Sequence, residues 1–180
     1  MVFRFNIISL VLFISLGGLS GISAQTPRFT KFDVMKTGAA AYFPAEPEFE
    51  MTLSEDKSEV YTAEVKVGDF TYGSIIVKFK EPLGDDTDDW DSLVISYMRF
   101  LNEGVFELES ETAPGFGHTL DSNPSARGVL QYGEDEDGIQ YTIKGWVDGQ
   151  FMAVMYVSYM EEMNINFQNL FLDGFRFPNK

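Results

Sequence analysis

The chain has 180 residues, no cysteine, and 28 acidic against 13 basic side chains, which gives a formal net charge of −15 at pH 7. The absence of cysteine excludes disulfides, thiol catalysis and thiolate metal sites. The negative charge makes nucleic acid and anionic membrane surfaces poor partners, because binding to phosphate requires clustered lysine and arginine. A basic partner, a divalent cation and simple solubility remain as reasons for the charge, and solubility is the simplest.

The first 24 residues have the parts of a secretory signal peptide. Arg4 gives a basic start, an apolar run follows from Ile7 to Leu16, and Ile22-Ser23-Ala24 is typical of a signal-peptidase site. The apolar run is too short for a membrane-spanning helix, which needs about 20 residues, so a retained anchor is the weaker alternative. We expect cleavage after Ala24 and a periplasmic or secreted protein with no stable membrane anchor.

We expect residues 25–37 to be a partly ordered lead-in segment and residues 38–180 to form a single domain. A domain of this length encloses a hydrophobic core without disulfides. The 17 Phe, 8 Tyr and 2 Trp residues supply large side chains to fill that core.

Alternation of apolar and polar residues predicts four strands in the first half of the domain. They are residues 39–43, 49–53, 61–67 and 72–80. Phe49, Met51 and Leu53 should share a buried face of the second strand, and the turns between strands are short. Successive strands joined by short turns indicate an antiparallel meander.

The period becomes helical over residues 89–103. Apolar side chains recur there at the spacing of one helix face: Trp90, Leu93, Val94, Tyr97 and Leu101. Acidic residues before this stripe favour a helix start, and Gly104 favours its end. We expect the stripe to pack on the sheet face that carries Ile75, Val77 and Phe79.

Residues 105–124 have no clear period and should hold a loop and one short strand. Three predicted strands follow: residues 126–132, 139–147 and 150–159. Asp148-Gly149 is the expected hairpin turn between the last two. Asn164 is typical of a helix N-cap, and Phe167, Leu170 and Phe171 should form that helix's buried face. Gly174 should end the helix, and residues 175–177 should return as a short strand.

This order predicts an α+β domain in which a mostly antiparallel sheet packs with two main helices. Three local features accompany it: the segment Tyr42–Pro47, the aromatic hairpin around Tyr141 and Trp146, and the closing segment Phe171–Phe177. Together they resemble the Mog1/PsbP-like superfamily over about residues 38–178. The resemblance implies a sandwich of sheet and helices that serves mainly as a binding or accessory module, as in photosystem accessory subunits, a nuclear transport factor and exported bacterial domains of unknown role. It assigns no functional residue here, because these motifs concern packing rather than chemistry.

The densest acidic cluster lies before and at the start of the predicted helix 89–103: Asp85, Asp86, Asp88, Asp89 and Asp91. Calcium prefers several hard oxygen ligands of this kind. The run lacks both the central glycine and the distant glutamate of an EF-hand loop. We therefore expect Asp88 or Asp89 to cap the helix and Asp91 to complement its dipole, with calcium binding as the alternative.

The remaining candidates each have a simpler structural explanation. Glu134–Asp137 is expected to be a solvated hairpin tip rather than a calcium site. His118, the single histidine, is expected to be a loop residue, because no nucleophile motif accompanies it.

The methionines and large aromatics also favour packing over binding. Met152 and Met155 have the spacing of copper-binding thioethers, as do Met160 and Met163. Positions three apart on a strand point to opposite faces, so the first pair should fill the core. Trp90, Trp146 and the tyrosines are more easily explained as core residues than as the lining of a sugar or peptide groove.

We therefore expect an exported, non-enzymatic accessory or binding module for a protein or small ligand, with no catalytic residue, no cofactor and no metal. The alternatives are an exported enzyme that uses carboxylates or a divalent cation and, more weakly, a calcium-stabilised structural domain. A pocket with convergent carboxylates of raised pKa would favour the enzyme, and an exposed apolar patch would favour the binding module.

Overall fold

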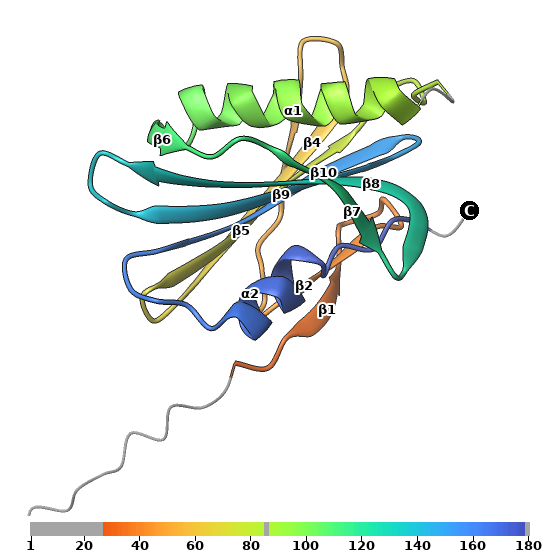
Figure 1. Cartoon of the computed structure of the whole chain (residues 1–180). Coiled ribbons are helices and arrows are strands. Elements are labelled where there is room, and N and C mark those ends of the chain that lie inside the picture. The colour runs from red at the N-terminus through yellow and green to blue at the C-terminus, as the bar shows by residue number, and fades with distance from the viewer. Residues whose placement is uncertain (1–26, 85–86, 179–180) are drawn as a thin grey trace, which may run out of the picture.

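The computed structural model describes residues 27–84 and 87–178, so the predicted signal peptide at residues 1–24 lies outside the described part of the chain. Figure 1 shows α1 (Thr87–Gly104) across one face of a large antiparallel sheet, with α2 (Ile165–Leu172) and the hairpin of β1 (Thr30–Asp33) and β2 (Ala40–Phe43) on the other face. This confirms an α+β domain with a mostly antiparallel sheet and two helices. In the described ranges, neither helix is both long and apolar enough to cross a membrane.

The large sheet has the strand order β3-β4-β5-β10-β9-β8-β6, and β7 also pairs with β8. Its strands are β3 (Glu50–Leu53), β4 (Glu59–Val67), β5 (Phe70–Lys78), β6 (Leu108–Glu111), β7 (Gly115–Leu120), β8 (Asn123–Asp135), β9 (Gln140–Asp148) and β10 (Phe151–Tyr159). Strands β3 to β5 form one meander and strands β8 to β10 form a second. The two meanders pair through β5 and β10, where Ile76 lies opposite Ala153. The sheet is thus continuous, with both faces available for packing.

The α1 layer forms one of two cores and confirms the predicted helical stripe. Trp90, Val94 and Leu101 are buried against a cluster that includes Ile75 and Val77. Leu93 and Tyr97 are half-buried and pack against the same cluster.

Close packing of α1 depends on Gly145 in β9. A Cβ atom at Gly145 would lie 2.4 Å from Cγ1 of Val94 and 3.0 Å from the sulfur of Met98. Both distances are shorter than ordinary van der Waals contact, so a side chain at Gly145 would push the helix away from the sheet.

On the opposite face, a second core surrounds Trp146, Tyr72 and Phe171. The rings of Tyr72 and Phe171 meet edge to face with centroids 5.2 Å apart. The indole nitrogen of Trp146 donates a hydrogen bond to the carbonyl of Leu172 at 2.8 Å, which ties β9 to α2. Because both faces are covered, β5 and β10 are apolar on both sides rather than alternating.

The N-terminal segment 25–37 contains a strand that the sequence analysis did not predict. β1 pairs with β2, with Phe32 opposite Ala41. Of the four residues of β1, Phe32 alone is half-buried, and the others are exposed. A strand that buries so little has almost no hydrophobic period.

Residues 105–124 hold two strands, β6 and β7, rather than the single strand expected. Both pair with the long strand β8, β6 near its end and β7 near its start, and both pairings contain register shifts. Gly117, which lies between paired positions of β7, has a φ of 82°. These irregularities hide the period of two on which strand prediction relies.

The prediction that Phe49, Met51 and Leu53 share a buried face is wrong for two of the three. Met51 is 48% exposed and Leu53 is 62% exposed, because β3 is an edge strand and α2, on the same face of the sheet, packs on β10 instead. Phe49 does reach the core, where its ring centroid lies 6.1 Å from that of Phe43.

The turn between β9 and β10 lies one residue later than predicted. Asp148 pairs with Phe151, so the two turn residues are Gly149, with a φ of 58°, and Gln150. Asp148 is buried and accepts a hydrogen bond from the side chain of Asn123 at 2.6 Å. This contact holds Asp148 in the strand.

The last helix begins as predicted, and its buried face matches the prediction in part. The side chain of Asn164 accepts from the backbone nitrogen of Asn166 at 2.9 Å, which confirms the N-cap. Phe171 is buried as predicted, together with Gln168 and Leu172, whereas Phe167 is half-buried and Leu170 is 52% exposed. Gln168 is polar but can be buried because its side chain donates a hydrogen bond to Thr142. The spacing of apolar residues alone does not indicate a buried glutamine.

The end of α2 and the closing segment follow the prediction in part. The N–H of Gly174 bonds to the carbonyl of Phe171 at 2.8 Å just after the helix ends. Residues 175–177 form a single bridge, between Arg176 and Ala40, rather than a strand.

Candidate functional site

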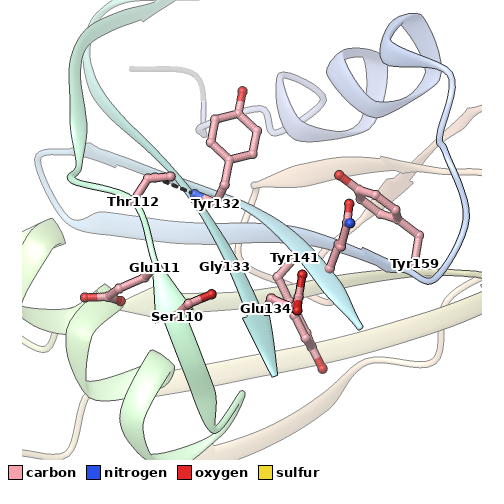
Figure 2. Close-up of a pocket in the computed structure, with 9 residues that line it drawn as sticks. Ser110, Glu111, Thr112, Tyr132, Gly133, Glu134, Tyr141 and Tyr159 are labelled. Carbon is pink, nitrogen blue, oxygen red and sulfur yellow. Dashed lines mark hydrogen bonds between the residues drawn. The ribbon is translucent and has the colours of Figure 1, made fainter. Parts of the chain in front are cut away.

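A groove lies on the α2 side of the sheet, where the ends of β8, β9 and β10 approach the loop before α2 (Figure 2). It consists of two adjoining hollows of about 290 and 440 Å³. The two hollows share Tyr132, Gln140 and Tyr159. They therefore form one continuous surface, which we call the tyrosine groove.

Strand register builds the tyrosine groove. Glu134 on β8 lies opposite Gln140 on β9, which lies opposite Tyr159 on β10. Tyr132 is two residues before Glu134, and side chains two apart on a strand share a face. In Figure 2, Tyr132 and Tyr159 stand on the side of α2, while Tyr141 points to the opposite side of the sheet.

Buried polar side chains fix the floor of the groove and the start of α2. The Thr142 hydroxyl oxygen accepts a hydrogen bond from Nε2 of Gln168 at 2.7 Å and lies 3.2 Å from the Tyr159 hydroxyl. Thr142 and Gln168 are both buried. The Tyr159 ring is thus held in place before any ligand arrives, which lowers the entropy cost of binding.

The opposite rim is held by residues that follow β6. The backbone nitrogen of Tyr132 donates to the Thr112 hydroxyl at 3.1 Å, shown dashed in Figure 2, and the Thr112 nitrogen donates to the Tyr132 carbonyl at 2.9 Å. The Gln131 side chain donates to the Thr112 carbonyl and accepts from Asn102 of α1. Asn102 also donates to Glu111, so the end of α1 supports this rim.

The tyrosine groove is acidic. Its lining includes four glutamates and no lysine, arginine or histidine: Glu111, Glu134, Glu161 and Glu162. The ion pairs in the described residues are Lys78 with Glu59 and Lys144 with Asp173, so none of the four is neutralised by a basic side chain. A cation entering the groove would meet carboxylates and the faces of tyrosine rings, both of which attract positive charge.

The groove also exposes apolar side chains. Met160 is 65% exposed, Ile165 55% and Tyr132 43%. All three belong to the lining of the larger hollow, together with half-buried Met163. Exposed apolar surface with a charged rim is typical of a site where another molecule docks.

Next to the groove, the acidic run Glu134–Asp137 forms a hairpin tip, as expected. A carboxylate oxygen of Asp135 accepts from the backbone nitrogens of Asp137 at 3.0 Å and Ile139 at 2.9 Å, which closes the turn. Burial, followed by the charge of Asp135, raises the pKa of Tyr141 to about 12. Asp135 therefore has a structural role, while Glu134 faces the groove.

The acidic cluster that the sequence singled out lies at the start of α1. Asp85 and Asp86 fall outside the described residues, and the side chain of Asp88 is likewise not described. Asp89 is exposed and Asp91 is half-buried. Because α1 begins at Thr87, Asp88 and Asp89 lie within its first turn, and the prediction that one of them is the N-cap is wrong. Acidic residues there still interact favourably with the helix dipole.

Within the described ranges, no group of three or more histidine, aspartate and glutamate side chains is arranged to hold a metal ion. Calcium binding by the run from Asp85 to Asp91 stays the alternative prediction, and Asp85 and Asp86 lie outside these ranges.

The other candidates fall on strands and in cores. His118 lies on β7 opposite Gly128, not in a loop, and burial followed by the charge of Lys144 lowers its pKa. Met152 and Met155 enter different cores, as their spacing predicts. Trp90 and Trp146 are both buried, which confirms that they are packing residues.

No protein-family model matches the chain, and no curated protein is similar enough to serve as a relative. The tyrosine groove must therefore be interpreted from its own chemistry. Sequence reasoning noted the tyrosines only as a group. One local pattern could have indicated the groove: Tyr132 lies near the polar end of a predicted strand, two residues before Glu134.

Proposed function

We propose that this protein is an exported, non-enzymatic binding module whose tyrosine groove holds a basic, extended segment of a partner protein. The observation that carries the proposal is the combination of Tyr132 and Tyr159 with four glutamates and no basic side chain in one groove. Opposite charge would also steer such a partner toward a protein of net charge −15.

The chemistry of the groove favours arginine or lysine in the partner. A cation over a tyrosine face gains about 0.5–1 kcal/mol at an exposed site, and nearby carboxylates add to this. The apolar stem of such a side chain would lie against Met160 and Ile165, both exposed in the free protein. Carboxylates and apolar contacts together therefore select a long basic side chain over a small inorganic cation.

The shape favours a segment over a single small molecule. The groove is made of two adjoining hollows that share three lining residues. A peptide in extended conformation advances about 3.3 Å per residue, so several consecutive residues would be needed to occupy both hollows. Alternate side chains would then face the groove.

We also propose export and a Mog1/PsbP-like fold, on the basis of residues 1–24 and the order of elements. Expression with the leader in a Gram-negative host should give a soluble periplasmic protein that starts at Gln25. Recovery of the full-length chain in the membrane fraction would contradict export.

The groove can be tested with a labelled peptide of alternating arginine and alanine, titrated in fluorescence anisotropy at physiological ionic strength. Glu161→Gln/Glu162→Gln should weaken binding about tenfold, equivalent to about 1.4 kcal/mol. Tyr132→Ala should weaken it further, since it removes an aromatic face. A peptide with glutamate in place of arginine should not bind.

The matched control is Glu55→Gln/Glu81→Gln, which removes the same charge from exposed positions outside the groove. This variant should bind the arginine peptide like the unmodified protein. Equal weakening by both double variants would show that overall charge, and not the groove, attracts the peptide.

A further inference from the structure

A larger hollow, of about 610 Å³, lies along a different face of α2. It is formed by the turn between β7 and β8 and by the α2 residues Asn166, Asn169 and Leu170, with Asp173 and Arg176 at its end. Its lining shares no residue with the tyrosine groove. The composition of the two sites also differs, because this one mixes amides and hydroxyls with charges of both signs.

Asp173 is held in a fixed orientation in this hollow. One carboxylate oxygen accepts from the ammonium of Lys144 at 2.6 Å, and the Lys144 side chain is 9% exposed while that of Asp173 is 43% exposed. The Lys144 ammonium also lies 4.8 Å from the ring centroid of Trp146, and Arg176 donates to the Asp173 carbonyl at 2.8 Å. Buried lysine beneath a half-exposed carboxylate is the arrangement of a supported ligand-binding group.

The charges around the hollow cancel. Asp121 and Asp173 contribute two negative charges, while Arg176 and the underlying Lys144 contribute two positive charges. A strongly charged ligand would meet opposing fields here, whereas a neutral polar ligand would not. The balanced charge of this hollow therefore favours a different class of ligand from the one that the acidic tyrosine groove favours.

The uncharged lining fits hydroxyl groups. Asn166 and Asn169, three residues apart on α2, present amides that both donate and accept, and Thr119 and Ser122 add hydroxyls that do the same. Leu170, 52% exposed, adds an apolar surface to this polar lining. A molecule with several neighbouring hydroxyls and apolar C–H groups matches both features.

We propose that this hollow is a binding site for a neutral saccharide. Asp173, fixed by Lys144, accepts hydrogen bonds from sugar hydroxyls, and Asn166 and Asn169 complete the polar contacts. The sugar's C–H face lies against Leu170. This site is independent of the tyrosine groove, and either one can exist without the other.

The test is a titration of isotope-labelled protein with glucose, N-acetylglucosamine and maltose, followed by two-dimensional amide NMR. At least one of these sugars should saturate the shifts of the Asn166 and Asn169 side-chain amides and of the Asp173 backbone amide. Asn166→Ala/Asn169→Ala should weaken that affinity at least tenfold. Both residues are exposed on α2, and no side-chain hydrogen bond of theirs supports the described fold, so this variant should stay folded.

Two controls make the outcome decisive. Glu161→Gln/Glu162→Gln, which alters only the tyrosine groove, should leave sugar binding unchanged. Tetraethylene glycol, which offers ether oxygens in place of a ring of hydroxyls, should not produce the saturating shifts. No saturating shift with any of the three sugars, or equal shifts in the Asn166→Ala/Asn169→Ala variant, would overturn the proposal.

Discussion

Lys144 in the centre of the sheet and Asp173 at the C-cap of α2 form an ion pair at 2.6 Å, although 29 residues separate them in the chain. One residue earlier, the Leu172 carbonyl accepts from the indole of Trp146 at 2.8 Å. Strand β9 therefore holds the last turn of α2 at two consecutive residues. The tyrosine groove and the hollow that contains Asp173 both use residues of α2, so this attachment positions both sites.

Removing Asp173 should destabilise the fold measurably. Asp173→Ala leaves the buried ammonium of Lys144 without its counter-charge, and breaking a buried pair costs about 3–5 kcal/mol. Because Asp173 is itself 43% exposed, water replaces part of the interaction, and we expect a loss of about 2 kcal/mol in urea unfolding. Lys78→Met, which breaks the more exposed pair with Glu59 at 3.1 Å, should cost less than about 1 kcal/mol. Equal costs for the two variants would contradict a special role for the Lys144 pair.

His118 should make the protein less stable in mildly acidic solution. Its pKa is lowered in the folded state, first by burial and then by Lys144, with Asp173 acting in the opposite direction. The unfolded chain then binds more protons than the folded one, so stability is complete above the ordinary histidine pKa of about 6.5 and falls as pH drops through the folded value.

Melting temperature measured between neutral and mildly acidic pH tests this expectation. His118→Gln should flatten the curve over the range just below pH 6.5. If the variant and the unmodified protein lose stability in parallel, the acid sensitivity belongs to other groups.

The α1 core can be tested by comparing two leucines. Leu101 is 2% exposed in the α1 core, and Leu101→Ala should cost about 2–5 kcal/mol through lost burial and a cavity. Leu53 is 62% exposed on β3, so Leu53→Ala should change the free energy of unfolding by less than about 0.5 kcal/mol. Chemical denaturation measures both, and a larger effect at Leu53 would contradict the layer arrangement.

The acidic residues at the start of α1 should act through the helix dipole. Asp89→Ala should cost about 0.3–1 kcal/mol, and the cost should shrink in high salt. Calcium and chelator should leave the melting temperature unchanged, because a dipole interaction needs no ion. A calcium-dependent rise in melting temperature that disappears in Asp86→Ala/Asp88→Ala would instead show a calcium site.

The elements that sequence predicted well are those with a strong hydrophobic period. Strand β4 buries alternate residues and α1 buries one stripe, so both could be located from composition and spacing. Strands β1 and β6 bury few side chains, and β7 is irregular, so their apolar signal is weak. Their position is decided by pairing with β2 and β8, which a local pattern does not reveal.

The candidate sites could not be predicted because they depend on register between distant segments. Glu134, Gln140 and Tyr159 become neighbours only once β8, β9 and β10 pair in their particular register. Likewise, Asp173 meets Lys144 only after α2 packs on the sheet. The sequence drew attention instead to Asp85–Asp91, where many carboxylates are consecutive. Carboxylates that are close in sequence did not indicate which side chains lie together in the fold.

Whether the tyrosine groove binds a basic segment can be measured by mapping where an arginine and alanine peptide contacts the protein. Amide NMR during a titration should show saturating shifts at Tyr132, Gln140, Tyr159 and the loop before α2. Saturating shifts centred elsewhere, for example around Glu48, Glu50 and Glu64 on the far edge of the sheet, would contradict the claim. Weak shifts spread evenly over the acidic surface would contradict it equally.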